Sequence, residues 1–252
     1  MRKKVDLILE NVLIESVAAE GKALAHYDGV VVFVEFAVPG DVVDIRVTSK
    51  KKNFMEGYVL RTVTPSPDRL EPFCPHFGVC GGCKWQPLPY EMQLAAKQQQ
   101  VYDQLVRIGH LDIPEITPII GSDNTRFYRN KLEFTFSSSK WFTSKTDAEN
   151  ASAKERCGLG FHVGRFFDKV LDIDRCLLQS EPTNNIRLFI KQFCIDKGIE
   201  FYNLRENRGI LRGITVRTNR QGHVMLTVVF GDDFPLRTAL LDAVAAAFPQ
   251  IK

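Results

Sequence analysis

Long apolar segments are missing from this chain of 252 residues. Its longest apolar runs, such as the one from Val30 to Phe36, are far shorter than the ~20 residues that a membrane-spanning helix needs. The basic start at residues 1–4 is followed by Asp6, Glu10 and Glu15, which interrupt any apolar core of a signal peptide. We therefore expect a soluble protein that stays in the compartment where it is made.

Extremes of composition are also missing. The 17 glycines and 12 prolines are ordinary numbers, which excludes a low-complexity or collagen-like chain. The net charge is only +3, so the total indicates no partner. Its distribution is uneven, because residues 126–176 and 177–252 each carry ten basic and seven acidic residues, net +3. This half is the better candidate for an anion-binding surface, although solvated surface charge explains the same numbers.

The first segment, residues 1–64, contains short β-rich runs separated by turn signals. The runs are Val5–Ile14, Val30–Phe36, Val42–Val47 and Gly57–Val63. Short strands at such spacing are typical of a closed barrel of the OB type, whose faces commonly bind oligonucleotides. Thr64–Asp68 then has the composition of a linker, because its two prolines cannot donate to a strand ladder.

The last segment, residues 90–252, mixes helical and alternating patterns. Residues 90–108 are expected to form a helix, and Lys131–Ser137 forms a half-buried strand with three apolar residues on one face. The polar stretch 143–154 has no periodicity and predicts a mobile hairpin loop. Further strands are expected at 159–167, 169–173, 213–218 and 223–230, and helices at 180–198 and 236–248. The whole chain is therefore predicted to be an α+β, multi-domain protein whose last domain has an antiparallel sheet.

Three of the six cysteines fall within ten residues of the middle segment, 65–89: Cys74-Pro-His-Phe-Gly-Val-Cys80-Gly-Gly-Cys83. Without a signal peptide, the even count does not indicate a disulfide framework. The C-x5-C-x2-C spacing can bring three thiolates to one metal or cluster. Gly78, Gly81 and Gly82 allow the tight turns that such a loop needs.

Two metal centres fit this spacing. A structural zinc site usually shows two C-x2-C pairs, and only one is present, which favours a 4Fe-4S cluster held by four thiolates. His76 can still complete a Cys3His zinc site, so zinc stays an alternative. Among the remaining cysteines, Cys194 lies on the apolar face of a predicted helix and Cys157 borders the polar loop. Cys176 ends a predicted strand, which can hold a ligand rigidly, so we prefer it as the fourth ligand.

With these motifs, the chain resembles the N-terminal portion of the TrmA-type (RumA-like) RNA uridine 5-methyltransferases. Residues 1–62 resemble the TRAM domain of that family, an OB-like RNA-binding barrel, and residues 74–83 resemble its iron–sulfur loop. Tyr128–Lys131, Leu159–His162 and Val170–Ile173 with Cys176 resemble its central domain. The resemblance implies that Cys74, Cys80, Cys83 and Cys176 hold a 4Fe-4S cluster.

The resemblance also implies a function and a limit. Family members use S-adenosylmethionine, bound by a Rossmann-like C-terminal domain, to methylate a uridine in RNA, here a large-subunit ribosomal RNA of the bacterial cytoplasm. No G-x-G-x-x-G loop follows a strand here, and no cysteine has the context of a nucleophile. We therefore expect a fragment, the RNA-recognition half of the enzyme, that lacks the methyltransferase domain and the catalytic residues and is inactive alone. The alternative is a zinc-stapled, non-catalytic RNA-binding module.

Basic residues in two regions are the candidates for RNA contacts. Lys50, Lys51 and Lys52 lie in a loop of the predicted barrel, and Arg129 and Lys131 open the alternating strand. Five arginines follow within sixteen residues, of which Arg212 and Arg217 lie in or beside a predicted strand; the others are Arg205, Arg208 and Arg220. We expect these cations to line one groove between the two domains. The alternative is that they are scattered, solvated or paired with acids.

Overall fold

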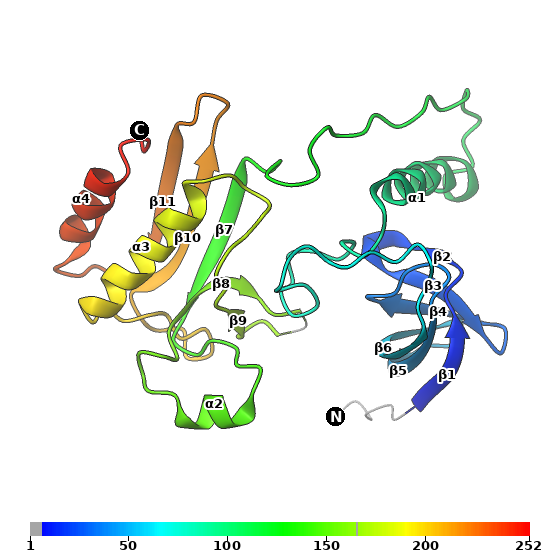
Figure 1. Ribbon diagram of the computed structural model, residues 1–252, viewed down its shortest axis with the longest axis horizontal. Coiled ribbons are helices and arrows are strands. Elements are labelled where there is room, and N and C mark those ends of the chain that lie inside the picture. Colours follow the sequence, from blue (N-terminus) through cyan, green and yellow to red (C-terminus); the bar gives the residue numbers. More distant parts are fainter. Residues whose placement is uncertain (1–6, 165) are drawn as a thin grey trace. The chain divides into compact units, whose positions relative to one another are not determined.

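The computed structural model describes residues 7–164 and 166–252. Its chain divides into two compact units, each described here by itself. The first comprises residues 1–78 and 83–123, and the second residues 79–82 and 124–252 (Figure 1). Val5 and Asp6, at the start of the first predicted strand, lie outside the described residues. Within the described ranges, no helix is long and apolar enough to span a membrane.

The first unit is built on one six-stranded sheet in the order β1-β5-β6-β4-β3-β2. Its inward side chains form a core from several strands, including Leu9, Val32, Val43, Ile45 and Met55. Gly57 has to be glycine, because a Cβ there would lie 2.6 Å from Cγ2 of Ile45. The strands are β1 (Leu7–Leu13), β2 (Ser16–Val17), β3 (Ala23–Tyr27), β4 (Val30–Glu35), β5 (Val42–Lys50) and β6 (Phe54–Thr64).

All strand pairs of this sheet are antiparallel except β4 with β6, which run parallel. The 3-10 turn η1 (Ala19–Gly21) connects β2 to β3. The helix α1 (Tyr90–Tyr102) continues into the π-helical turn η2 (Asp103–Ile108), and both belong to this unit. The predicted helix 90–108 is therefore helical throughout, with a change of winding at Asp103.

The second unit contains a five-stranded antiparallel sheet in the order β11-β10-β7-β8-β9. The helices α3 and α4 lie side by side against this sheet (Figure 1). The strands are β7 (Lys131–Ser137), β8 (Gly158–His162), β9 (Val170–Leu171), β10 (Leu211–Thr218) and β11 (Val224–Phe230). The helices are α2 (Lys145–Asn150), α3 (Thr183–Asp196) and α4 (Arg237–Ala247).

The alternation of β7 gives its sheet a buried face and an exposed one. Phe134 and Phe136 are buried, whereas Glu133 is exposed. On α3, Ile186, Ile190 and Cys194 are buried at 0% exposure, which confirms that Cys194 is a core residue. The face of the sheet that carries Glu133 is the one on which charged side chains reach solvent.

The prediction of a mobile loop over 143–154 is wrong. The structure has the short helix α2 there, and the Ser144 hydroxyl accepts a hydrogen bond from the backbone N–H of Asp147 at 3.3 Å. A side-chain cap of this kind stabilises a helix that has no apolar periodicity. The apolar pattern of the sequence therefore did not indicate this helix.

Candidate functional site

The cysteine loop is fastened to the first unit at both of its ends. The Cys74 N–H donates to Oε1 of Gln86 at 3.1 Å, and Phe77 packs edge-on against Phe36 with ring centroids 5.8 Å apart. After the loop, the Lys84 ammonium donates to the carbonyl of Glu20 at 3.0 Å. These contacts fix Cys74 and Cys83, both half-buried, as parts of the first unit.

The middle of the loop pairs with the second unit instead. Cys80 forms an isolated antiparallel bridge with Val163, and the Gly81 N–H donates to the carbonyl of His162 at 3.0 Å. Gly81 must approach closely, because a Cβ there would lie 2.8 Å from that carbonyl. The Gly82 N–H lies 3.4 Å from Sγ of Cys80, the kind of N–H to sulfur contact that stabilises a thiolate.

Cys176 is buried at 6% exposure and its backbone is held from two sides. Its N–H donates to Oδ1 of Asn184 at 2.8 Å, and its carbonyl accepts from Nδ2 of the same side chain at 3.1 Å. The Asn184 amide is held in turn by the Glu181 carboxylate at 2.8 Å. This arrangement holds the backbone of Cys176 from two sides, and its role as a ligand stays a prediction.

Arg187 is a buried cation that reasoning from the sequence missed. Its guanidinium is completely buried and donates to the carbonyls of Leu159 and Asp174, each at 2.9 Å. Burial lowers the pKa of Arg187 from its ordinary value, and the nearby carboxylates of Asp172 and Asp174 oppose that shift. Because Asp174 lies two residues before Cys176, the Arg187 side chain fixes the segment that carries this cysteine.

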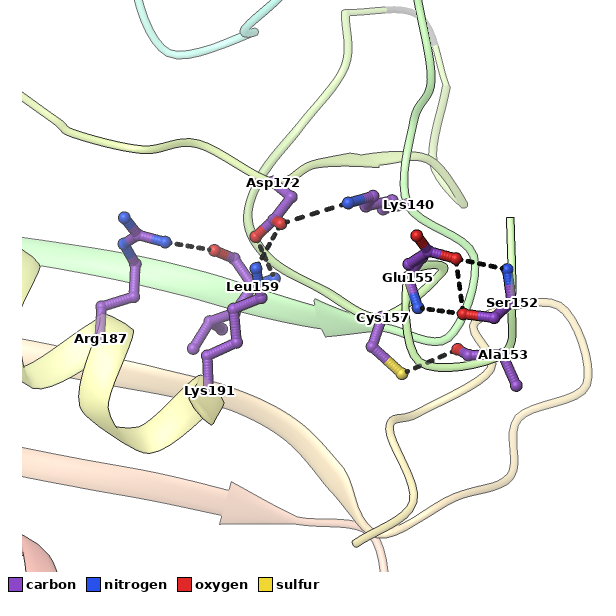
Figure 2. A network of polar contacts seen from close by, with 9 residues as sticks. All are labelled: Lys140, Ser152, Ala153, Glu155, Cys157, Leu159, Asp172, Arg187 and Lys191. Carbon is purple, nitrogen blue, oxygen red and sulfur yellow. Dashed lines mark hydrogen bonds and ion pairs between the residues drawn. The ribbon is translucent and has the colours of Figure 1, made fainter. Parts of the chain in front are cut away.

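A second ionic group lies beside Arg187. Figure 2 shows the Asp172 carboxylate between two lysines, with the Lys191 ammonium at 2.5 Å and the Lys140 ammonium at 3.6 Å. The carboxylate also accepts from the N–H of Leu159 at 3.2 Å. These contacts join β8, α3 and the strand end before Cys176 into one polar network.

The two remaining cysteines have the properties of structural thiols. Burial raises the pKa of Cys194 to about 12. Burial also raises the pKa of Cys157, whose Sγ donates to the carbonyl of Ala153 at 3.5 Å. In both groups burial makes the thiolate less favourable, which is typical of structural thiols.

The predicted ligand set is divided between the two units. Cys74 and Cys83 belong to the first, and Cys80 and Cys176 to the second. Across residues 7–164 and 166–252, no three side chains of His, Cys, Asp or Glu form a group that could hold a metal ion. The shared cluster therefore stays a prediction.

Two of the three predicted RNA-binding lysines lie in a loop, as predicted, whereas Lys50 belongs to a strand. Lys50 ends β5, and Lys51 and Lys52 are exposed in the turn before β6, which the Lys51 N–H closes by donating to the carbonyl of Phe54 at 2.8 Å. These residues belong to the first unit and the predicted arginines to the second, so the expected common groove also stays a prediction.

Lys131 and Arg217 are cross-strand neighbours on β7 and β10. The Lys131 ammonium pairs with the Glu133 carboxylate at 2.5 Å, and this bond is the first cause that lowers the pKa of Glu133, with Arg217 adding a smaller effect. Two cations therefore accompany one carboxylate on this face. Arg129 is exposed just before β7, and its N–H donates to the carbonyl of Leu178 at 2.8 Å.

The other arginines are engaged locally. Arg212 lies over the ring of Tyr202 at 4.7 Å. Arg208 pairs with Glu206 at 2.6 Å, and Arg205 forms a short ion pair with Asp168. For Arg205 and Arg208, the alternative of pairing with acids therefore describes the structure.

Known proteins match nearly the whole chain. The family model for the TRAM domain matches residues 10–60. An uncharacterized RNA methyltransferase of Porphyromonas gingivalis is 49% identical over 244 residues, which cover 94% of this chain and 52% of the relative. These matches confirm the resemblance to the TrmA-type (RumA-like) RNA methyltransferases that the motifs predicted. Another uncharacterized RNA methyltransferase, from Bacteroides thetaiotaomicron, is 44% identical and covers 93% of this chain.

A solved structure has the same fold. It is the tRNA (uracil-54, C5)-methyltransferase of Pyrococcus abyssi in complex with S-adenosyl-L-homocysteine. The likeness has a TM-score of 0.62 at 23% identity, and it covers 91% of this chain and 48% of the other. The chain spans about half the length of the curated relatives that it matches.

These matches correct the expected fold class and function in one respect. We expected a fragment without the methyltransferase domain, but RNA methyltransferases match 94% of the chain and the fold of a methyltransferase covers 91% of it. The lack of a G-x-G-x-x-G loop was weak ground, because that motif is a fingerprint of dinucleotide-binding proteins. The claim that the catalytic domain is missing is therefore dropped, and the expected inactivity of the chain has no support.

Proposed function

We propose that the protein is an S-adenosylmethionine-dependent methyltransferase acting on carbon 5 of a uridine in RNA. The observation that carries this proposal is the match to RNA methyltransferases over 94% of the chain. The TRAM match at residues 10–60 supports RNA as the partner, and the structural likeness to a uracil C5 methyltransferase supports the base and position. S-adenosylmethionine supplies the methyl group when bound. The residues described above bind and orient the RNA.

We propose large-subunit ribosomal RNA, in the bacterial cytoplasm, as the substrate class. The test is transfer of a labelled methyl group from S-adenosylmethionine by the full-length protein, with unmodified large-subunit ribosomal RNA and unmodified transfer RNA offered separately. We expect 5-methyluridine in the ribosomal RNA only. Label only in transfer RNA would overturn the substrate class, and label in neither RNA would overturn the activity.

The exposed face of the second sheet is the proposed RNA contact. Replacing Lys131 and Arg217 together with alanine should weaken RNA binding and make it less sensitive to salt, because each lost phosphate contact with a single strand reduces the salt slope by roughly 0.7. The measurement is RNA affinity at several salt concentrations. Arg208→Ala is the matched control, since it removes an exposed arginine that precedes β10 and is not part of this face. Equal affinity and slope in the double variant and the wild type would remove this face from the interface.

We propose further that Cys74, Cys80, Cys83 and Cys176 hold a 4Fe-4S cluster. Four thiols are the donor set that such a cluster takes, and the Gly82 N–H at Sγ of Cys80 is the contact that would stabilise a bound thiolate. The two hydrogen bonds from the Asn184 side chain to the backbone of Cys176 support the role of Cys176 as a fixed ligand. Cys157 and Cys194 stay outside the proposed set, because Cys194 is completely buried in the core and the Cys157 thiol donates to the carbonyl of Ala153.

The cluster proposal predicts a difference between two serine variants. Anaerobically purified wild type should contain about four irons and matching sulfide per chain, with visible absorption. Cys176→Ser should lose most of this iron, whereas Cys157→Ser should keep it, because its thiol bonds only to a nearby carbonyl. Zinc in place of iron would favour the Cys3His alternative with His76. Iron retained in Cys176→Ser and lost in Cys157→Ser would contradict the assignment.

A further inference from the structure

Three aromatic rings gather near the turn between β8 and β9. Phe166 and Phe167 follow one another there and are exposed at 46% and 73%. Trp141, from the segment after β7, packs against Phe166 with ring centroids 5.4 Å apart and an interplanar angle of 31°. Adjacent exposed aromatic side chains form a patch, and such patches mark interaction sites more often than a single exposed ring does.

Arg205 reaches solvent beside this turn while its acidic partner is buried. The side chain of Arg205 is 68% exposed, whereas that of its partner Asp168 is only 5% exposed. The hydrogen bond from Arg205 is the first cause that lowers the pKa of Asp168, so this carboxylate stays ionised beneath the arginine. Lys140, beside Trp141 in the sequence, is mostly buried, with 24% of its side chain exposed, and it pairs with Asp172. A ligand approaching from solvent therefore meets positive charge and aromatic faces.

A polar cavity of about 170 Å³ adjoins the turn. Its lining includes the hydroxyls of Ser138 and Ser139, and the Lys169 ammonium donates to Oγ of Ser139 at 3.1 Å. Two carboxylates, Asp168 and Glu206, also line the cavity, and each is paired with an arginine. Phe167, Asp168 and Lys169 are consecutive, so the same turn carries an exposed ring and a cavity-lining cation. Hydroxyl and cationic donors beside an aromatic face match one unpaired nucleotide, with its base on the ring and its phosphate or ribose at the cavity.

We propose that Phe166 and Phe167, supported by Trp141, form a stacking site for an unpaired base of the RNA, and that Lys169 and Arg205 bind the backbone of the same nucleotide. This proposal rests on the proposed RNA function and adds a position at which a base is held. Stacking accepts any base, because every base has a π-face, so the site grips single-stranded RNA without reading its sequence.

The test separates stacking from phosphate binding by comparing two RNA oligonucleotides of equal length, one with bases and one abasic. Phe167→Ala should weaken binding of the normal oligonucleotide about tenfold, because the stack between one base and this ring is lost. It should leave binding of the abasic oligonucleotide unchanged, and Phe167→Tyr should restore the affinity. Phe127→Ala is the matched control, because Phe127 is also exposed, at 43%, but precedes β7.

A second measurement uses Trp141, one of only two tryptophans in the chain. In a Trp85→Phe background, the normal oligonucleotide should quench the remaining emission and the abasic one should not. Equal loss for both oligonucleotides in Phe167→Ala, or no loss for either, would overturn the stacking site. Neither result would contradict the proposed function, as long as the wild-type protein binds RNA. Failure of the wild type to bind any RNA would instead remove the proposed function itself.

Discussion

Replacing Arg187 with alanine is expected to lower the free energy of unfolding of the second unit by about 3–5 kcal/mol. The guanidinium is completely buried and donates to the carbonyls of Leu159 and Asp174. The guanidinium carbon Cζ of Arg187 also lies 5.6 Å from the ring centroid of Phe134. Replacing this side chain with alanine therefore leaves a cavity between α3 and the sheet. Because a domain is stable by only about 5–15 kcal/mol, this single change should bring the unit close to unfolding.

Urea unfolding followed by circular dichroism measures this effect. Arg187→Met, which keeps most of the volume, should show a smaller loss, because it removes the two hydrogen bonds without opening the cavity. Arg220→Ala is the control: Arg220 is exposed in the β10–β11 turn, and its removal should change stability by less than about 0.5 kcal/mol. A loss in Arg187→Ala no larger than that of the control would contradict the role assigned to this cation.

Strong periodicity in the sequence predicted the elements that it marks. The strand Lys131–Ser137 is observed with the predicted bounds, and the hairpin predicted at 213–218 and 223–230 is β10 and β11. The helix predicted at 236–248 is α4, shorter by one residue at each end. In each case the apolar spacing agrees with the burial that the tertiary structure imposes, so local pattern and packing point the same way.

Elements with weak patterns were missed or misplaced. The strand β3 was not predicted, because Ala23–Tyr27 contains two alanines and a histidine in place of the β-branched residues that mark a strand. The strand predicted over 159–167 ends at His162, since the chain turns there and returns as β9. Pairing with neighbouring strands decides both that β3 forms and that β8 ends at His162. A single sequence does not reveal this pairing.

The candidate site was predicted only where its residue types are rare. Three cysteines in ten residues are conspicuous, whereas an arginine in an amphipathic helix is not. Arg187 did carry a signal, because it precedes Ile190 by three residues and Cys194 by seven, which places it on the buried stripe of α3. A charged residue at a core position needs buried partners, and here they are backbone carbonyls that no pattern displays.

The segment Thr64–Asp68 was predicted to be a linker, but the structure shows that it is packed. Its prolines indicate a linker, yet Ser66 in its middle is buried at 5% exposure. The Ser66 N–H donates to Oδ1 of Asp41 at 2.9 Å, a contact across 25 residues of sequence. Composition describes the backbone that a segment prefers, but long-range hydrogen bonds decide whether it is packed.

Replacing Asp41 with alanine should therefore be about as damaging to the first unit as loss of Arg187 is to the second, at about 3–5 kcal/mol. The carboxylate is 0% exposed and accepts three hydrogen bonds, from the N–H groups of Val38 and Ser66 and from the Arg69 guanidinium at 2.5 Å. Alanine leaves two amide groups and a partly buried guanidinium without their acceptor, and each unmet buried group costs about 1–3 kcal/mol.

The position of Asp41 makes this change informative beyond stability. Arg69 and Ser66 precede the cysteine loop directly, so release of Asp41 should free the segment that leads to Cys74 while the strands of the sheet stay paired. Limited proteolysis should cut Asp41→Ala between β6 and Cys74, with the unfolding midpoint in urea lowered in parallel. Glu71→Ala removes an exposed carboxylate from the same segment and should change neither measurement. Unchanged proteolysis in Asp41→Ala would show that the segment is held by its other contacts, such as the Leu70 N–H to the carbonyl of Pro87 at 2.9 Å.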